Sequence, residues 1–141
     1  MIRHATLDDA PRLAELAAQW GYPADAAALR GPLARLLGRL DQSVLVTTDN
    51  SGTIVGWIHV GEQDLLESGR RAEILGLVVD ANARGQGVGR ALVAEAERWA
   101  AARGLREMSV RSNVVRAEAH PFYEAVGYRR IKTQHVYKKK L

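Results

Sequence analysis

A glycine-rich turn flanked by arginines is the strongest chemical signal in this sequence. It runs from Arg84 to Arg90 as Arg-Gly-Gln-Gly-Val-Gly-Arg, directly after an apolar run and directly before a helical pattern. Glycines let a ligand approach the backbone closely, and the first N–H groups of a helix have no acceptor within that helix. The turn is therefore a candidate phosphate-binding site, to which the two arginines would add positive charge.

Two common phosphate-binding motifs do not fit this turn. A P-loop needs Lys followed by Ser or Thr after its last glycine, and neither follows here. A dinucleotide fingerprint counted from Gly85 and Gly87 needs a third glycine at the position of Arg90. The pattern that remains is Arg-x-x-Gly-x-Gly, formed by Arg84, Gly87 and Gly89, with a purely structural turn as the alternative.

The strand before the turn carries two unusual residues. Glu73 opens the run Glu-Ile-Leu-Gly-Leu-Val-Val-Asp, and a carboxylate is unexpected in a strand that is otherwise apolar. It could take part in proton transfer, or it could pair with Arg70 or Arg71. Gly76 interrupts the same run, and a glycine inside a strand favours a bulge or a close approach of the backbone to a ligand.

The predicted elements place the turn near the centre of a mixed α/β chain. Residues 2–5 form a strand, and a helix capped by Thr6 or Asp8 follows and stops at Gly21. A second helix is predicted over about 24–40, strands over 43–48, 53–60 and 72–80, a helix over 87–103 and a strand over 108–110. A helix then runs from Pro121 to Gly127, and the remaining residues form one strand or a tight hairpin.

Composition limits the class of protein. The 141 residues include no cysteine, which excludes a disulfide scaffold, a thiolate metal site and a cysteine nucleophile. No set of His and carboxylate residues has the spacing of a metal site, so no metal is predicted. Without a linker, a membrane-length apolar run or a secretion signal, we expect a single cytoplasmic domain over residues 1–141.

The net charge of +4 arises largely from a basic segment near the C-terminus. Much of the excess lies between Arg129 and Lys140. Such a run is most often a solvated tail, and after that it could attract a small anionic ligand. Because no nucleic-acid-binding motif accompanies the charge, we expect no nucleic-acid partner.

Two segments resemble motifs of the GNAT superfamily of acyl-CoA-dependent N-acyltransferases. Residues 73–93, EILGLVVDANARGQGVGRALV, are similar to the central motif of that family. Ser112-Asn113 and residues 119–128, AHPFYEAVGY, are similar to its C-terminal motif. The resemblance implies the GNAT fold, a mixed and mostly antiparallel sheet of six to seven strands with a central splay, flanked by about four helices.

The resemblance also implies that acetyl-CoA is the acyl donor. Its pyrophosphate would lie on Arg84, Gly85, Gln86, Gly87, Val88, Gly89 and Arg90. A bulge at Gly76 would splay neighbouring strands apart and admit the pantetheine arm. Backbone groups of Leu77 and Val79 would hydrogen-bond this arm, the Val79 N–H would face the thioester oxygen, and Asn113 would lie near the arm.

Two catalytic roles follow from the same resemblance. Glu73 would deprotonate the amine, directly or through water, and Tyr123 would protonate the departing thiolate. Tyr123 could alternatively be a packing residue. Asn113 and Tyr123 are ten residues apart, a longer spacing than is usual in the family. The form Asn-x-x-Arg-x-x-Ala-His-x-Phe-Tyr resembles a subgroup that includes aminoalkylphosphonate and aminoglycoside acetyltransferase-like members.

The acceptor pocket of the family is built from the first two helices and the loops at the open end of the sheet. Here that implies Trp20, Tyr22 and His59, each of which could instead be a packing residue. The segment Glu62–Arg71, interpreted as a loop, has carboxylates that could attract a cationic amine.

The predicted activity is transfer of an acetyl group from acetyl-CoA to a primary amine, by direct attack in a ternary complex, on a small-molecule acceptor. A non-catalytic acyl-CoA sensor and a transferase acting on a protein amine are the alternatives. The C-terminal strand could pair across two chains, which would give a homodimer. No membrane partner is expected.

Overall fold

The computed structural model describes residues 1–22, 25–114 and 119–141 of the chain. The chain forms two compact units, residues 1–110 and residues 111–141, and each is described by itself. The middle of the predicted Asn113–Tyr123 motif lies outside the described residues.

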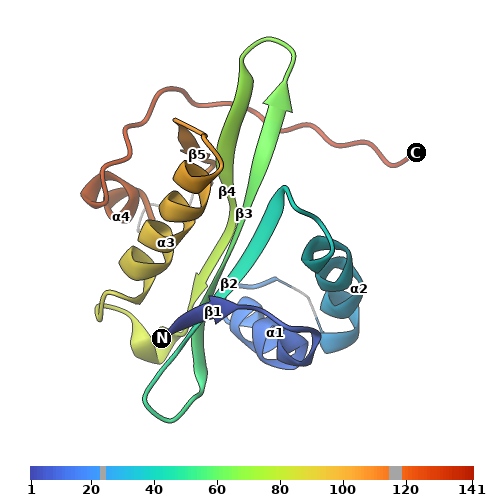
Figure 1. Ribbon diagram of the computed structural model, residues 1–141, viewed down its shortest axis with the longest axis vertical. Helices are drawn as coiled ribbons and strands as arrows, with labels where there is room; N and C mark the ends of the chain where they lie inside the picture. The colour runs from blue at the N-terminus through green and yellow to red at the C-terminus, as the bar shows by residue number, and fades with distance from the viewer. Residues whose placement is uncertain (23–24, 115–118) are drawn as a thin grey trace. The chain divides into compact units, whose positions relative to one another are not determined.

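The first unit is built around a mixed sheet of five strands (Figure 1). These are β1 (Ile2–His4), β2 (Gln42–Thr48), β3 (Ile54–Leu65), β4 (Gly69–Val79) and β5 (Met108–Val110). They lie in sequence order, and every neighbouring pair is antiparallel except β4 and β5, which are parallel. The predicted mixed and mostly antiparallel sheet is confirmed.

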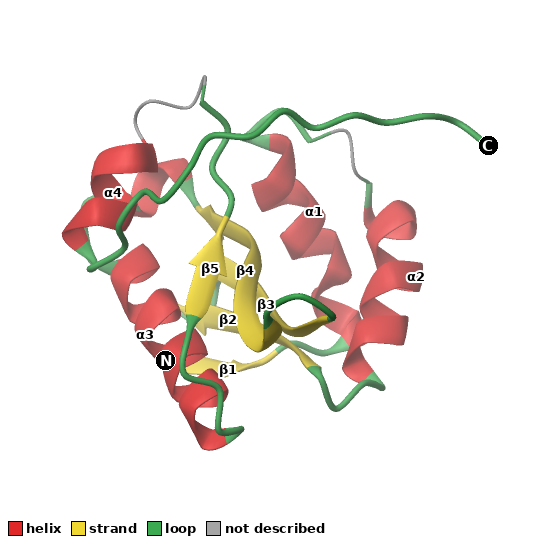
Figure 2. Cartoon of the chain, turned by 90° about the horizontal axis from the view of Figure 1, so that it is seen from above, coloured by secondary structure: helices red, strands yellow, loops and turns green. Residues whose placement is uncertain are grey.

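Helices cover both faces of this sheet. The helices α1 (Ala10–Ala18) and α2 (Ala26–Leu37) lie on one face, and α3 (Val88–Ala102) lies on the other (Figure 2). A short 3₁₀ turn precedes α1, and there the Asp9 carboxylate accepts the backbone N–H of Thr6 at 2.8 Å. Thr6, one of the two predicted caps, thus caps the 3₁₀ turn, whereas α1 itself has Asp9 at its N-cap position.

The two faces carry separate regions of the core. On one face, Leu13 and Leu16 of α1 belong to the same buried cluster as Val46 and Val78 of the sheet. On the other face, α3 lies so close to Gly56 that a Cβ there would meet side-chain atoms of α3 at 3.0 and 3.1 Å. Close packing of α3 on the sheet fixes where the helix begins, and therefore where the glycine turn lies.

The strands β4 and β5 separate at the point where the bulge occurs. They pair only at Ala72–Ile74 of β4. Beyond it, β4 continues to Val79 with no strand on its β5 side among the described residues. His59 of β3 faces Gly76 and the next residue, Val60, faces Ile74, so Leu75 is the extra residue of a bulge. The predicted bulge and splay are both confirmed.

The structure corrects two predictions about strands. Five strands are described where six to seven were predicted, and residues 129–141 contain none. The side chains of Ile131 and Val136 are exposed, so this basic segment buries too little apolar surface to order a strand. The predicted loop Glu62–Arg71 is mostly a hairpin, because β3 and β4 stay paired as far as Leu65 and Gly69.

The second unit contains the helix α4 (Ala119–Ala125), close to the helix predicted from Pro121. Gly127 follows it with a φ of +100°, a backbone conformation that favours glycine. Across the described ranges of both units, no helix combines the length and apolar character needed to cross a bilayer.

Candidate active site

The glycine turn lies on the surface between the end of β4 and the start of α3. Gly85 and Gly87 have φ angles of +76° and +80°, and no atom lies within 4 Å of where their Cβ atoms would be. The first helical residues, Val88, Gly89 and Arg90, follow at once. The hydrogen bonds of the helix begin after them, with the N–H of Ala91 donating to the carbonyl oxygen of Gly87. An open backbone, a helix N-terminus and exposed arginines fit an anionic pyrophosphate.

The open edge of β4 leads into this turn. The backbone N–H of Asp80 donates to Val55 of β3 at 2.8 Å. Because the backbone groups of an antiparallel strand alternate in direction, those of Val79 and Leu77 point away from β3. They therefore face the side on which β5 has ended. Leu77 and Val79, the residues predicted to bind the pantetheine arm, thus have their polar backbone groups on the part of the β4 edge that leads to the turn and that no described strand pairs with.

Glu73 lies where β4 and β5 are still paired. Glu73 is 7% exposed, and the Ser109 hydroxyl donates to its Oε1 at 3.1 Å. Arg70, one of the predicted alternative partners, pairs with Glu62, to whose Oε1 it donates from Nε at 2.8 Å. Glu73 faces Gly61 in register and His59 faces Gly76, so both side chains lie on the sheet face that α1 and α2 cover.

His59 forms a fixed pair with Gln42. The distance from His59 Nε2 to Gln42 Oε1 is 2.7 Å. Burial lowers the pKa of His59, which favours the neutral ring. A neutral ring that donates from Nε2 keeps Nδ1 as its proton acceptor. Near it, the Trp57 ring packs over Gly76, where a Cβ would meet it at 2.9 Å, so a side chain at this position is excluded.

One of the carboxylates predicted to attract an amine, Glu62 of the β3–β4 hairpin, is already paired. Glu62 accepts from Arg70 and, at 3.3 Å, from Arg103 of the segment after α3. The pKa of Glu62 is lowered mainly by the Arg70 hydrogen bond. Glu62 therefore braces the hairpin against α3. Glu62 and Arg70 meet because β3 pairs with β4, and no local sequence pattern indicates this contact.

Sequence reasoning missed a network that holds the end of β4. Asp80 is 8% exposed and accepts from Arg12 at 2.8 Å, from Gln19 at 3.3 Å and from the backbone N–H of Asn82 at 3.1 Å. Gln19 in turn accepts from the Ala81 N–H at 2.8 Å. The only available signal was an Asp directly before a turn, since its side-chain partners Gln19 and Arg12 lie 61 and 68 residues away in sequence.

Replacing Asp80 by Asn is expected to lower the free energy of unfolding by about 1–3 kcal/mol, because Arg12 loses a charged acceptor. The pKa of Asp80 is lowered, first by the Asn82 N–H and then by Gln19 and Arg12. A lowered pKa in the folded state stabilises at neutral pH, and this stabilisation is lost as the pH falls through that pKa.

Urea unfolding of both proteins between pH 7 and pH 3 measures this effect. The difference between parent and variant should shrink towards acid, and a difference independent of pH would contradict the assignment. Glu95→Gln, which removes an exposed pair with Arg98, is the control and should change the free energy by less than about 0.5 kcal/mol.

Two predicted site residues belong to the second unit. The ring of Tyr123 is half-buried and makes edge-to-face contacts with Phe122 at 5.2 Å and with Tyr128 at 6.2 Å between centroids. Asn113 is exposed, and its carbonyl oxygen lies 3.1 Å from His120 Nε2. The roles of Tyr123 and Asn113 stay predictions.

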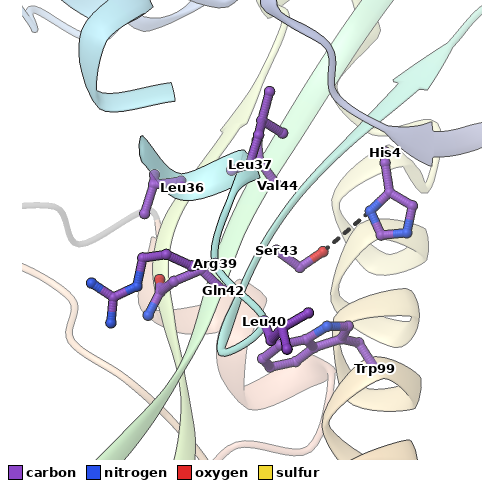
Figure 3. A pocket seen from close by; sticks show the side chains of 9 residues that line it. All are labelled: His4, Leu36, Leu37, Arg39, Leu40, Gln42, Ser43, Val44 and Trp99. Atoms are coloured by element: carbon purple, nitrogen blue, oxygen red, sulfur yellow. Dashed lines mark hydrogen bonds between the residues drawn. The ribbon is translucent and has the colours of Figure 1, made fainter. Parts of the chain in front are cut away.

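Two of the cavities formed by the described residues lie in the first unit. One, of about 240 Å³, opens beside β2 and is lined by His4, Ser43 and Trp99 among others (Figure 3). It contains none of the predicted site residues. The other, of about 320 Å³, includes Gln86 and Val88 of the glycine turn and threonines of the β2–β3 hairpin.

A mixed sheet whose fourth and fifth strands separate beside a glycine turn and helix defines the GNAT type of acyltransferase fold. The sequence model of the acetyltransferase (GNAT) family matches residues 9–128. The chain therefore belongs to the GNAT acetyltransferase family.

Solved structures share the fold over their whole length. An aminoglycoside 6'-N-acetyltransferase, AAC(6')-Ig from Acinetobacter haemolyticus, has a TM-score of 0.87 at 16% identity, with 100% of this chain and 99% of that chain covered. AAC(6')-Iy in complex with CoA has a TM-score of 0.89 at 18% identity, with 100% and 95% covered. A protein of Bacillus halodurans C-125 described as a transcriptional regulator has a TM-score of 0.83 at 25% identity, with 100% and 99% covered. No curated protein sequence matches the chain.

Proposed function

We propose that this protein transfers the acetyl group of acetyl-CoA to a primary amine of a small molecule, by direct attack within a ternary complex. The observation that carries the proposal is the continuity of the open β4 edge with the glycine turn. Leu77 and Val79 present backbone groups on that edge. The glycine turn, with Arg84 and Gly87, follows shortly after Val79 in the sequence. A long donor with a phosphate at one end matches this arrangement.

The donor would be held mainly by the backbone. The proposed pyrophosphate site consists of Arg84, Gly85, Gln86, Gly87, Val88, Gly89 and Arg90, and Asn113 is proposed to contact the arm. Acetyl-CoA, when bound, supplies a thioester as the electrophile. Backbone groups of Leu77 and Val79 would orient the arm, and the Val79 N–H would hydrogen-bond the carbonyl oxygen as negative charge develops on it.

Glu73 is the proposed base. An alkyl ammonium has a pKa of about 10, so it must lose a proton before the nitrogen can attack. The Ser109 hydroxyl hydrogen-bonds Oε1 and so helps to orient the carboxylate, which would accept this proton directly or through water. Tyr123 is the proposed acid, which donates its phenolic proton to the leaving sulfur.

Trp20, Tyr22 and His59 are proposed to contribute to acceptor binding. His59 supports this role because its pairing with Gln42 leaves Nδ1 to accept a hydrogen bond on the same face as Glu73. A small-molecule acceptor is supported by the relatives, which include a structure of AAC(6')-Iy with a bisubstrate analogue joining CoA to an acetylated aminoglycoside fragment.

Calorimetric titration with CoA, followed by thiol release from acetyl-CoA across a panel of primary amines, tests the proposal. Saturable binding and release on one class of small amine are expected. Binding without release on any small amine, or release only on a protein amine, would contradict the proposed acceptor, and the former would favour an acyl-CoA sensor. Absence of binding would refute the donor site.

A pair of glycine variants separates binding from folding. Gly87 and Gly104 lie at opposite ends of α3 with φ angles of +80° and +78°, and neither has an atom within 4 Å of a built Cβ. Alanine at either should cost a similar amount of stability, about 1–2 kcal/mol. Only Gly87→Ala should weaken CoA binding, by about tenfold or about 1.4 kcal/mol. Equal affinity of the two variants would remove the turn from the donor site.

A further inference from the structure

The side chain of Trp20 links the end of α1 to the proposed donor site. The guanidinium carbon of Arg84 lies 3.8 Å from the centroid of the Trp20 ring, which is a stacked cation–π contact. The Trp20 indole N–H donates to the carbonyl oxygen of Val79 at 3.4 Å. One side chain therefore contacts both the arginine of the turn and the strand edge that leads to it.

The contact with Trp20 restricts the position of the Arg84 guanidinium. Arg84 is exposed, and an exposed arginine loses side-chain entropy when it binds a ligand. Stacking on an aromatic face restricts the plane of the guanidinium but leaves its N–H groups, which lie in that plane, able to form two parallel hydrogen bonds to a phosphate.

Trp20 is supported by the buried core and by hydrogen bonds of the residue before it. The ring packs against the buried cluster that contains Leu13, Leu16 and Val78. The adjacent residue, Gln19, hydrogen-bonds Asp80 and Ala81. The base of the stack is thus hydrogen-bonded to the same segment, Val79–Ala81, that leads into the turn.

We propose that Trp20 is a positioning residue for the acyl donor, which holds the Arg84 guanidinium in the orientation that binds the pyrophosphate. This inference rests on the proposed function and adds to it a residue outside the glycine motif. The contacts of Trp20 with Arg84 and Val79 thus add a donor-positioning role to the acceptor-binding role proposed above.

Calorimetric titration with CoA of four proteins tests the coupling: the parent, Trp20→Leu, Arg84→Ala and the double variant. Trp20→Leu should weaken CoA binding by about fivefold when Arg84 is present and by less than about twofold when Arg84 is alanine. Trp20→Phe keeps an aromatic face but no N–H group, and it should recover affinity to within about twofold of the parent. A merely structural role for Trp20 would not produce this dependence on Arg84.

The control is a second Trp–Arg stack in the same unit. Trp99 of α3 packs on Arg103 with 5.0 Å from the guanidinium carbon to the ring centroid, and Trp99→Leu should leave CoA affinity unchanged. Thermal midpoints of all variants show whether each folds, and Trp20→Phe keeps the test valid if Trp20→Leu does not.

Three outcomes would overturn the proposal. If Trp20→Leu weakens binding equally with and without Arg84, or if Trp20→Phe is as impaired as Trp20→Leu, Trp20 does not act by stacking on Arg84. If Arg84→Ala itself binds CoA like the parent, the proposed phosphate role of Arg84 fails, and the coupling fails with it. The single and double variants therefore distinguish failure of this inference from failure of the donor site.

Discussion

Replacing Glu73 by Gln is expected to lower kcat at neutral pH by about 10²- to 10⁴-fold, the usual contribution of a general base. Glutamine keeps the shape of the side chain and still accepts a hydrogen bond from Ser109, so the change removes proton acceptance with little disturbance of packing. The KM for acetyl-CoA should change by less than about threefold, because the proposed donor site consists of the β4 edge and the glycine turn and does not include Glu73.

The dependence of this defect on pH is the sharper measurement. An alkyl amine with a pKa of about 10 becomes deprotonated in solution as the pH rises, so the need for a base should fall. The rates of parent and variant should therefore converge above about pH 9.5. A constant ratio of rates across the pH range would assign the base elsewhere. Glu97→Gln, which changes an exposed carboxylate of α3, is the matched control and should match the parent.

Replacing Tyr123 by Phe is expected to lower kcat by about 10²-fold, at the lower end of general acid catalysis, because a thiolate is a good leaving group without full protonation. The phenylalanine ring keeps the edge-to-face contacts with Phe122 and Tyr128, so the fold of this unit should be maintained. CoA affinity should stay within about threefold of the parent value.

Steady-state kinetics and CoA calorimetry on the same preparation check the Tyr123 prediction. Tyr137→Phe changes an exposed tyrosine of the C-terminal segment and should leave kcat unaltered. A Tyr123→Phe variant with the kcat of the parent would show that Tyr123 is a packing residue. Equal losses in CoA affinity and in kcat/KM would instead make it a donor-binding residue.

The order of elements was predictable because the apolar patterns of the first unit are long and well bounded. The strand around Leu77, interrupted by Gly76 and followed by the glycine turn, indicated both the observed bulge and the proposed phosphate site. The strand after Gly127 was predicted wrongly, since alternating residues with a β pattern form a strand only where an edge and a buried face are available. A local sequence pattern shows neither whether a sheet edge is available nor whether a face will be buried.

The sequence by itself determined which residue types flank the turn, and so which chemistry the protein can support. Glycines with open backbone, a carboxylate in an apolar strand and the match of two motifs are all local features, and local features can be read without coordinates. Even the family follows from them.

Only the tertiary structure decided which of these residues meet. The stacking of Trp20 on Arg84, the Asp80 network and the pairing of Glu62 with Arg70 join residues that are distant in sequence or lie on opposite strands. Such contacts depend on helix packing and strand register, which are set by burial of the whole core rather than by any single segment. For that reason the contacts of Trp20 with Arg84 and Val79 could be recognised only in the structure.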